Sequence, residues 1–346
     1  MIMNLKKLLQ ESLENGRIQP IKDYLVAKDT VNAEYMENAK KIIDKVSDEV
    51  KDIFDTEFEF AQTETVPNVD DKDLTYANGE TKKGKEISTC VLFVDIRNSV
   101  ALNNETYTKT MGRIYTAFTK SVLRAAAHCG GYVRNIIGDR VMVVFPVENC
   151  FQNAVDCAIT INHIAQYVIS PKVKDHDFSC GIGIDYGTMR CIKVGVEKHG
   201  TENSDNKNLV WIGRPANMAS RLCDNANKEV QLFKVLHVVW EPKFSLAQPQ
   251  SLFGNMERKE KTEILTVEQI TEIITKSGYN SILSVEKEGK PEKHNPILLS
   301  KDVYDGFKKA CPNYNSVKDG LWKRDTRNIR DVSFPVYGAD LHWKLD

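Results

Sequence analysis

The 346-residue sequence is notable first for what it lacks. Its eight cysteines contain no C-x-x-C pair, and no histidine stands at zinc-ligand spacing from a cysteine. This pattern favours reduced, buried thiols in a cytoplasmic protein over a zinc site. No apolar run approaches the roughly eighteen residues that a membrane-spanning helix needs, and the opening residues are too polar for a signal peptide. We therefore expect no membrane insertion.

Charge of either sign is not in excess. Lys and Arg number 47 against 48 Asp and Glu, which gives a formal net charge of -1. No overall field therefore favours nucleic acid or an anionic membrane, and we expect no nucleic-acid partner. An anionic substrate would have to be captured by a local site.

The length predicts one large domain with an appended segment. Residues 1–60 place apolar side chains at helical spacing and predict a helical N-terminal region of two helices. The polar, turn-rich residues 61–86 are expected to form a linker. The main domain would then occupy residues 87–346.

Strand and helix patterns alternate within that domain, which favours an α/β or α+β fold. Helices are expected at 105–128, 149–168 and 215–226. Strands are expected at 89–94, 132–137, 140–145 and 209–212, with a hairpin formed by 179–185 and 189–196 and a polar loop at 198–207.

Two aspartates are placed where their side chains can converge. Asp95 follows the buried strand 89–94, and Asp139 lies in the turn of a hairpin expected beside it. Converging carboxylates suit Mg²⁺ or Mn²⁺ bound to a triphosphate. Either aspartate alone is typical of an ordinary turn or strand end, so only the combination predicts a metal site.

The residues around Asp95 allow two interpretations each. The backbone amides of Ile96, Arg97, Asn98 and Ser99 could open a helix N-terminus toward phosphate, or Asn98 and Ser99 could simply cap that helix. Phe93 could contact ribose or base, although a phenylalanine in a strand is more often part of the core.

A second polar pair lies farther along the chain. Asn217 and Arg221 are four residues apart on an expected helix and therefore share one face. Their neighbours are small or apolar. A polar pair on so tightly packed a helix indicates a site, whereas mere solvation is the alternative.

Three motifs, in order and spacing, resemble the class III adenylyl and guanylyl cyclases: Phe93-Val94-Asp95-Ile96, Gly138-Asp139, and the segment from Gly213 through Asn217 to Arg221. The resemblance covers about residues 88–227 and resumes at 295–304, which makes residues 228–293 an insertion. It implies a ferredoxin-like α/β (α+β) cyclase catalytic domain over 87–346, with a helical N-terminal extension and the insertion before the final strands.

The resemblance also implies roles for these residues. Asp95 and Asp139, with the carbonyl of Ile96, would hold two divalent ions, Mn²⁺ or Mg²⁺, on a nucleoside triphosphate. Asn217 would orient the ribose, and Arg221 would stabilise charge on the α-phosphate while the 3′-oxygen attacks and pyrophosphate leaves. In the family the metal-binding aspartates come from one subunit and the Asn and Arg residues come from the other, which implies a homodimer with shared active sites.

Two departures concern the base. Asn135 stands where purine cyclases carry Lys or Glu, and Val210 stands where many adenylyl cyclases carry Asp, so a donor and acceptor for adenine are missing. With the helical N-terminal region and the insertion, this looks like the pyrimidine cyclases of bacterial Pycsar antiphage systems. That resemblance implies UTP or CTP as substrate, with UTP favoured, and a cUMP or cCMP messenger read by a separate effector protein that disables the infected cell.

Other interpretations stay open. The same fold could be a purine cyclase in ordinary signalling, or a degenerate domain that only binds nucleotides, although retention of the Asp, Asn and Arg residues argues against degeneracy. Diguanylate cyclases and polymerase palms also use two carboxylates, but the chain lacks a Gly-Gly-Asp-Glu-Phe turn. The family's triphosphate lysine has no clear counterpart within a basic cluster, for which a solvated surface is the default: Trp322, Lys323, Arg324, Arg327 and Arg330.

Overall fold

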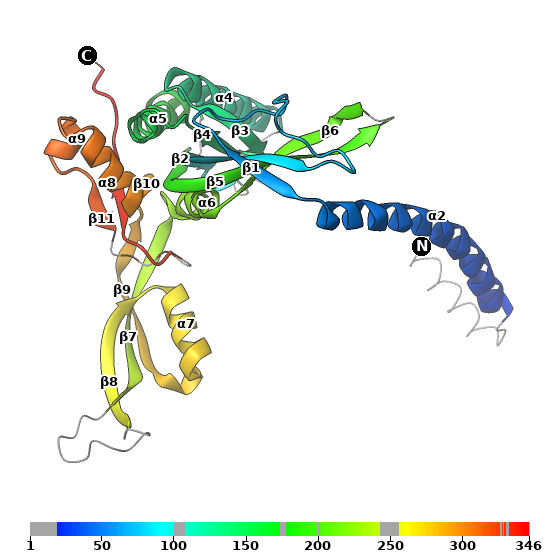
Figure 1. Cartoon of the computed structure of the whole chain (residues 1–346). Helices are drawn as coiled ribbons and strands as arrows, with labels where there is room; N and C mark the ends of the chain where they lie inside the picture. The colour runs from blue at the N-terminus through cyan, green and yellow to red at the C-terminus, as the bar shows by residue number, and fades with distance from the viewer. Residues whose placement is uncertain are drawn as a thin grey trace, which may run out of the picture. The chain divides into compact units, whose positions relative to one another are not determined.

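The computed structural model describes residues 19–99, 108–173, 178–198, 201–242, 256–325, 327, 329 and 332–345 (Figure 1). The chain divides into two compact units. The first consists of the chain up to Glu59 together with Thr75–Lys83, and the second consists of Phe60–Leu74 and Gly84 to the C-terminus. Helix α2 (Gln19–Asp55) forms most of the first unit, as expected for a helical N-terminal region. The first of the two expected helices lies outside the described residues.

A buried lysine holds the first unit together. The Nζ atom of Lys82, only 3% exposed, donates to a carboxylate oxygen of Asp52 near the end of α2 at 3.0 Å. The backbone amide of Gly79 donates to the same carboxylate at 2.8 Å. A buried ammonium needs such partners, so these bonds tie residues 75–83 to the helix.

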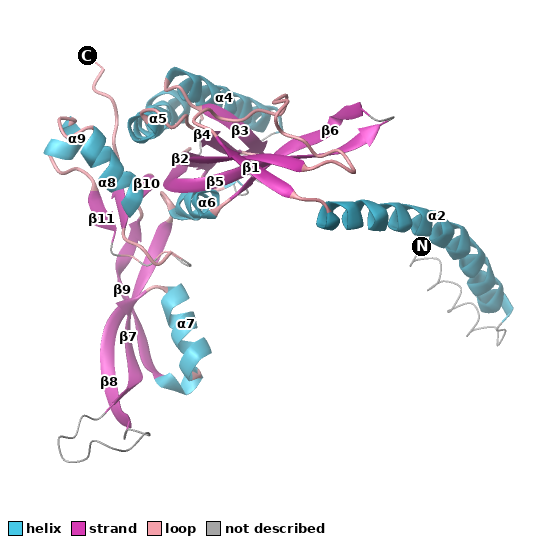
Figure 2. Ribbon diagram, in the orientation of Figure 1, coloured by secondary structure: helices cyan, strands magenta, loops and turns pink. Residues whose placement is uncertain are grey.

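A nine-stranded mixed sheet forms the framework of the second unit (Figure 2). Seven strands run in the order β11-β12-β10-β5-β2-β4-β3, while β1 pairs with β2 and β6 pairs with β5. The strands are β1 (Phe58–Gln62), β2 (Lys82–Ile96), β3 (Tyr132–Ile137), β4 (Arg140–Val144), β5 (Cys180–Lys198), β6 (Thr201–Ile212), β10 (Ile297–Ser300), β11 (Lys323–Asp325) and β12 (Val336–Ala339).

Helices cover both faces of this sheet, as Figure 1 shows. On one face α4 and α5 bury the alternate side chains of β2, β4 and β5, and on the other face α6 packs against the remaining ones. Strands that are buried on both faces are apolar throughout, which explains the run from Thr89 to Val94. The helices are α4 (Thr108–His128), α5 (Cys150–Ile164) with a π-helical turn (Ala165–Ile169) and a 3₁₀ turn (Ser170–Lys172), α6 (Arg214–Asn225), α8 (Lys301–Ala310) and α9 (Asn315–Lys318).

Three sequence expectations about the sheet differ from the structure. The residues predicted to form a hairpin at 179–196 form one continuous strand, β5, because β2 pairs with it without interruption from Lys85 opposite Cys191 to Ile96 opposite Cys180. The predicted polar loop at 198–207 belongs largely to β6, which pairs with the end of β5. Strand β2 likewise begins at Lys82, inside the expected linker. Partner strands supply the backbone hydrogen bonds that local sequence does not reveal.

The insertion has its own sheet. Strands β7 (Glu229–Pro242), β8 (Met256–Leu265) and β9 (Ile282–Lys293) pair antiparallel in the order β8-β7-β9. Helix α7 (Val267–Ser277) begins with a capping box, in which Thr266 and Gln269 exchange side-chain and backbone hydrogen bonds. The 3₁₀ turn Tyr279–Ser281 leads into β9.

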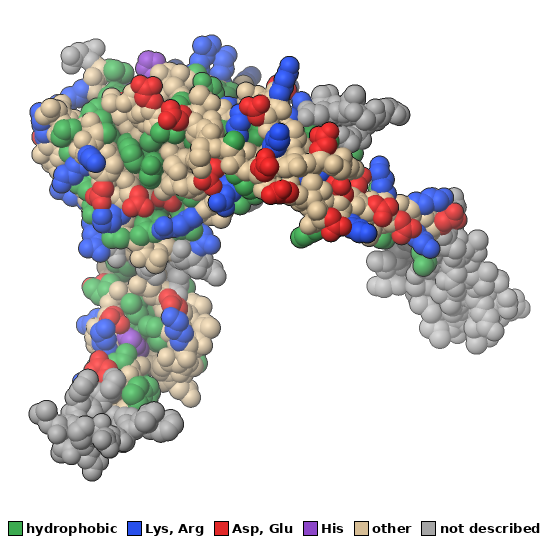
Figure 3. Space-filling model, viewed as in Figure 1, with side chains coloured by type: hydrophobic (Ala, Val, Ile, Leu, Met, Phe, Trp, Pro, Cys, Tyr) green, Lys and Arg blue, Asp and Glu red, His purple; other side chains and the backbone are tan. Residues whose placement is uncertain are grey.

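The state of the thiols and the distribution of surface charge agree with the sequence. All eight cysteines are free thiols, six of them buried. On the face that Figure 3 shows, basic and acidic side chains are interspersed, as the near-zero net charge predicts. None of the helices in the described residues is long and apolar enough to span a bilayer.

Candidate functional site

The turn between β3 and β4 brings Asp139 to the end of β2. The β2–β4 register pairs Val94 with Val141, so the next residues along β2 stand opposite Arg140 and Asp139. Gly138 has φ 62°, a conformation that glycine adopts without steric cost and that the tight turn requires. The side chains of Asp95 and Asp139 consequently lie within hydrogen-bonding reach of each other.

The two carboxylates make an electrostatically unfavourable pair. Burial, followed by the nearby charge of Asp95, raises the pKa of Asp139, while a hydrogen bond from Ser99 opposes the shift. The Oδ2 atom of Asp139 is buried and has no hydrogen-bond partner among the described residues. Two adjacent carboxylates with an unpartnered oxygen fit a hard divalent cation. The described residues contain no group of three or more His, Cys, Asp or Glu side chains suited to a metal, so such a cation would rely on this pair and on backbone or ligand oxygens.

Two arginines lie against the acid pair. Arg140 donates to an Asp95 oxygen at 2.8 Å, and the Arg97 guanidinium lies 3.5 Å from the same oxygen. Arg140 also donates to Ser220 at 3.1 Å and contacts Asp224, both on α6. Although burial opposes it, the hydrogen bond to Asp95 and the charge of Asp224 raise the pKa of Arg140.

The predicted phosphate cradle is only partly available. The Arg97 amide donates to the Ser179 carbonyl at 2.9 Å, and one guanidinium nitrogen donates to the Asp224 carbonyl at 3.1 Å. The other two guanidinium nitrogens are buried without a hydrogen-bond partner among the described residues. Asn98 is exposed in the left-handed conformation at φ 55°, and Ser99 faces Asp139. Ser99 already has helical backbone conformation, and residues 100–107, which follow it, lie outside the described residues.

Phe93 and Ile96 of the first motif are packed into the sheet. Ile96 is 3% exposed and belongs to the core beneath α4 and α5. Phe93 is half-buried on the opposite face, next to Met142 and Ala219, which agrees with a core role. Its position two residues before Asp95 still places it on the same face of β2 as that carboxylate.

Helix α6 carries the other predicted residues. It begins at Arg214 with Pro215 in its first turn, as its sequence indicates. Asn217 is exposed, and Arg221 lies one turn farther on. Asn217 makes no hydrogen bond with Asp95 or Asp139 within the described part of the chain. The described part of the chain therefore brings the two aspartates together without a direct contact from Asn217 to either of them that takes the form of a hydrogen bond.

The two predicted base-selecting residues are also apart. Asn135 is exposed on the edge strand β3, and Val210 is 41% exposed on β6. Strands β4, β2 and β5 separate them, which at the usual strand spacing is about 19 Å. Both can face one base only if the second residue comes from another copy of the chain.

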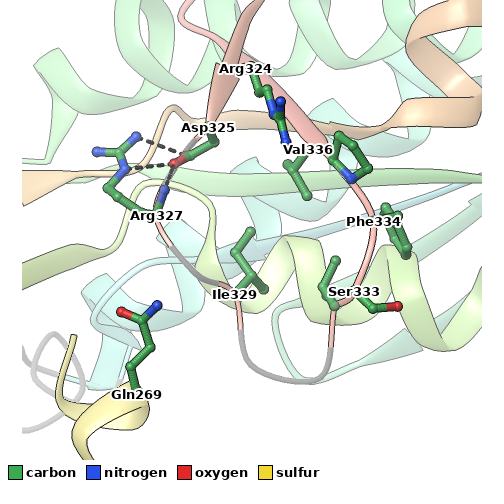
Figure 4. A pocket seen from close by; sticks show the side chains of 10 residues that line it. Gln269, Arg324, Asp325, Arg327, Ile329, Ser333, Phe334 and Val336 are labelled. Atoms are coloured by element: carbon green, nitrogen blue, oxygen red, sulfur yellow. Dashed lines mark hydrogen bonds and ion pairs between the residues drawn. The ribbon is translucent and has the colours of Figure 1, made fainter. Parts of the chain in front are cut away.

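The basic cluster divides into different environments (Figure 4). Trp322 is buried, and Arg327 donates twice to the Asp325 carboxylate at 2.8 Å. Arg324 lines a cavity of about 430 Å³ together with Gln269 and Phe334. Lys323 is exposed, and Arg330 lies outside the described residues.

Sequence reasoning missed the residues that surround the acid pair. Arg140 and Asp224 were not singled out, nor was Tyr115 of α4, whose pKa is raised by burial and then by the charge of Asp139. One indication of Arg140 was present: the residue after a turn aspartate must return along the hairpin, directly beside the strand that ends at Asp95. Nothing in the local sequence indicates Asp224.

Comparisons with known proteins give a consistent result. Residues 81–260 match the adenylate and guanylate cyclase catalytic domain. A uridylate cyclase from Burkholderia cepacia is 30% identical over 188 residues, which cover 53% of this chain and 77% of that protein. Another from a Rhodovulum species is 28% identical over 231 residues, covering 64% and 90%. The adenylyl cyclase CyaB from P. aeruginosa, a solved structure, aligns over 73% of this chain and 93% of its own, with 15% identity and a TM-score of 0.41.

Proposed function

Because the chain belongs to the family of adenylate and guanylate cyclase catalytic domains, we propose that it is a pyrimidine nucleotidyl cyclase, converting UTP, or CTP, into the 3′,5′-cyclic monophosphate and pyrophosphate. The structural observation that carries this proposal is the convergence of Asp95 and Asp139 at the edge of the sheet. The relatives named uridylate cyclase support the choice of base.

Asp95 and Asp139 would hold the divalent ions, Mn²⁺ or Mg²⁺, with the Ile96 carbonyl as a further ligand. The buried, unpartnered Oδ2 of Asp139 supports this assignment, because such an acceptor is costly unless a cation or donor occupies its position. Bound divalent ions would neutralise the triphosphate and stabilise the leaving pyrophosphate. Ser99 keeps the Asp139 carboxylate oriented through its hydroxyl.

The active site would be shared between two copies of the chain. Asn217 would orient the ribose, and Arg221 would stabilise the charge that develops on the α-phosphate as the 3′-oxygen attacks. The exposure of Asn217, together with the absence of a hydrogen bond from it to either aspartate among the described residues, supports a site completed by the α6 helix of a partner. The distance between Asn135 and Val210 supports the same arrangement, in which they select the base from opposite subunits.

An exposed stripe on α2 also supports a homodimer. Ile43, Val46, Val50 and Ile53 follow one another at spacings of three, four and three residues and are 44% to 63% exposed. Apolar residues at this spacing form the seam of a coiled coil, and a partner helix would remove them from water. A second α2 is the occupant we assign to this stripe.

The biological role that follows is messenger production in the cytoplasm. A cyclic pyrimidine nucleotide made here would be read by a separate effector protein, as part of an antiphage defence in which the infected cell is disabled. The capacity to supply such a messenger depends on base selectivity, because purine cyclic nucleotides would address other receptors.

The decisive experiment compares substrates. Purified chain is incubated with Mn²⁺ and each of UTP, CTP, ATP and GTP, and the products are identified by mass spectrometry. We expect cUMP to dominate, or cCMP, and expect neither product from the Asp139→Ala chain. Dominant cAMP or cGMP would contradict the base assignment, and the absence of any cyclic product would contradict the cyclase proposal.

A further inference from the structure

Arg140 occupies a particular position beside the acid pair. It is the first residue of β4, directly opposite Asp95, and its side chain is 29% exposed. One guanidinium nitrogen donates to Asp95 at 2.8 Å and also contacts Asp224, while the other donates to Ser220 at 3.1 Å. The guanidinium therefore bridges a proposed metal ligand on β2 and the last turns of α6.

This bridge opposes the binding of a cation. A guanidinium hydrogen-bonded to Asp95 neutralises that carboxylate, and a divalent ion at the same carboxylate would be repelled by it. Release of Asp95 by Arg140 would relieve this repulsion. The release leaves no unpaired charge, because Ser220 and Asp224 are already within contact and can keep the guanidinium.

The second end of the bridge carries functional residues. Ser220 and Asp224 lie on the same helix as Asn217 and Arg221, and helix positions three and four apart form neighbouring surfaces. An arginine that moves from Asp95 toward Asp224 therefore changes the charge next to the helix that would meet the nucleotide on a partner subunit. The metal side and the ribose side of the enzyme are joined through one side chain.

We propose that Arg140 is a positioning residue that stands in for the cation in the metal-free enzyme: it neutralises Asp95 until divalent ions bind, then transfers to Asp224 and so couples metal occupancy to helix α6. This inference rests on the proposed function, because it takes Asp95 and Asp139 as the metal ligands. Asp224 acts only through Arg140.

The test measures Mn²⁺ affinity without nucleotide, from the electron paramagnetic resonance signal of free Mn²⁺, on the full chain. Arg140→Gln removes the competing charge and should tighten Mn²⁺ binding about tenfold, the effect of one neighbouring charge on a carboxylate. Asp224→Asn removes the alternative negative charge, so Arg140 should favour Asp95 and Mn²⁺ binding should weaken by a similar factor.

The double variant isolates the mechanism. In the double variant Arg140→Gln with Asp224→Asn, the Mn²⁺ affinity should equal that of Arg140→Gln alone, because no guanidinium is left to pair with residue 224. Arg190→Gln serves as the matched control: it removes the same charge from β5, where Arg190 pairs with Glu86 at 2.8 Å, and should leave Mn²⁺ affinity unchanged.

Three results would overturn the proposal: equal affinity in wild type and Arg140→Gln, an Asp224→Asn effect that persists in the double variant, or no Mn²⁺ binding by wild type. If Arg140→Gln does not fold, weaker binding by Asp224→Asn supports the proposal and unchanged binding refutes it. Failure of the cyclase proposal is distinguishable, since it would appear as absent cyclic product while this binding pattern remains.

Discussion

Helix α6 packs against β5 so closely at Gly183 that there is no room for a side chain. This glycine lies on β5, opposite Phe93 on β2 and Leu298 on β10. A Cβ atom there would stand 2.2 Å from the Cys223 amide nitrogen and 2.3 Å from the Ala219 carbonyl oxygen. Both are backbone atoms of α6, so no side-chain rotation can relieve the clash.

We expect Gly183→Ala to destabilise the protein by about 3 kcal/mol, the upper end of the cost of overpacking a core. Ordinary contact between such atoms is about 3.5 Å, so α6 must move by roughly 1 Å. That movement would disturb the Arg140 contacts with Ser220 and Asp224, and cyclase activity should fall with stability.

Urea unfolding followed by tryptophan fluorescence measures the effect, since all four tryptophans belong to the second compact unit. Gly112→Ala is the matched control. Gly112 lies within α4 with no atom within 4 Å of an added Cβ, so the same chemical change should stabilise by about 0.5–1 kcal/mol through helix propensity. If Gly183→Ala were as stable as wild type, the close packing of α6 on β5 would be refuted.

Two further predictions concern the shared site and an acid-sensitive pair. Asp139→Ala and Arg221→Ala chains should each be inactive, and mixing them should restore part of the activity through heterodimers with one intact site; no recovery in a verified heterodimer would contradict shared sites. Although burial alone would raise the pKa of Asp325, hydrogen bonds from His294 at 2.7 Å and from Arg327 lower that pKa below the ordinary aspartate value of 3.8. The ionised Asp325 therefore stabilises the fold above that value and loses this contribution as pH falls below it, so Asp325→Asn should lower the urea midpoint at pH 7 and should narrow its difference from wild type at acid pH.

Much of the arrangement was predictable because it depends on local pattern. The apolar run before Asp95 predicts a buried strand, and Gly138-Asp139 between two β-branched runs predicts a tight turn. These two features suffice to place two carboxylates at one sheet edge. The motif that includes Asn217 and Arg221 likewise predicts a helix, with Pro215 at its start.

Other features were not predictable because they depend on which strand lies beside which. The residues around Gly187 have a turn-like composition, yet they continue β5, since β2 offers hydrogen bonds along their whole length. The polar residues from Thr201 onward are also strand, because β5 supplies their backbone hydrogen bonds. Composition describes a segment alone, whereas its backbone partners come from distant parts of the chain.

By itself the sequence predicted the buried strand before Asp95, the tight turn at Gly138-Asp139 and the helix of Asn217 and Arg221, because spacing and turn chemistry are local properties of the chain. Only the tertiary structure decided that Arg140 bridges Asp95 and Asp224 and that Gly183 lets α6 approach β5. Those contacts join residues far apart in sequence. They depend on strand register and on where α6 packs on the sheet, and no local pattern specifies either.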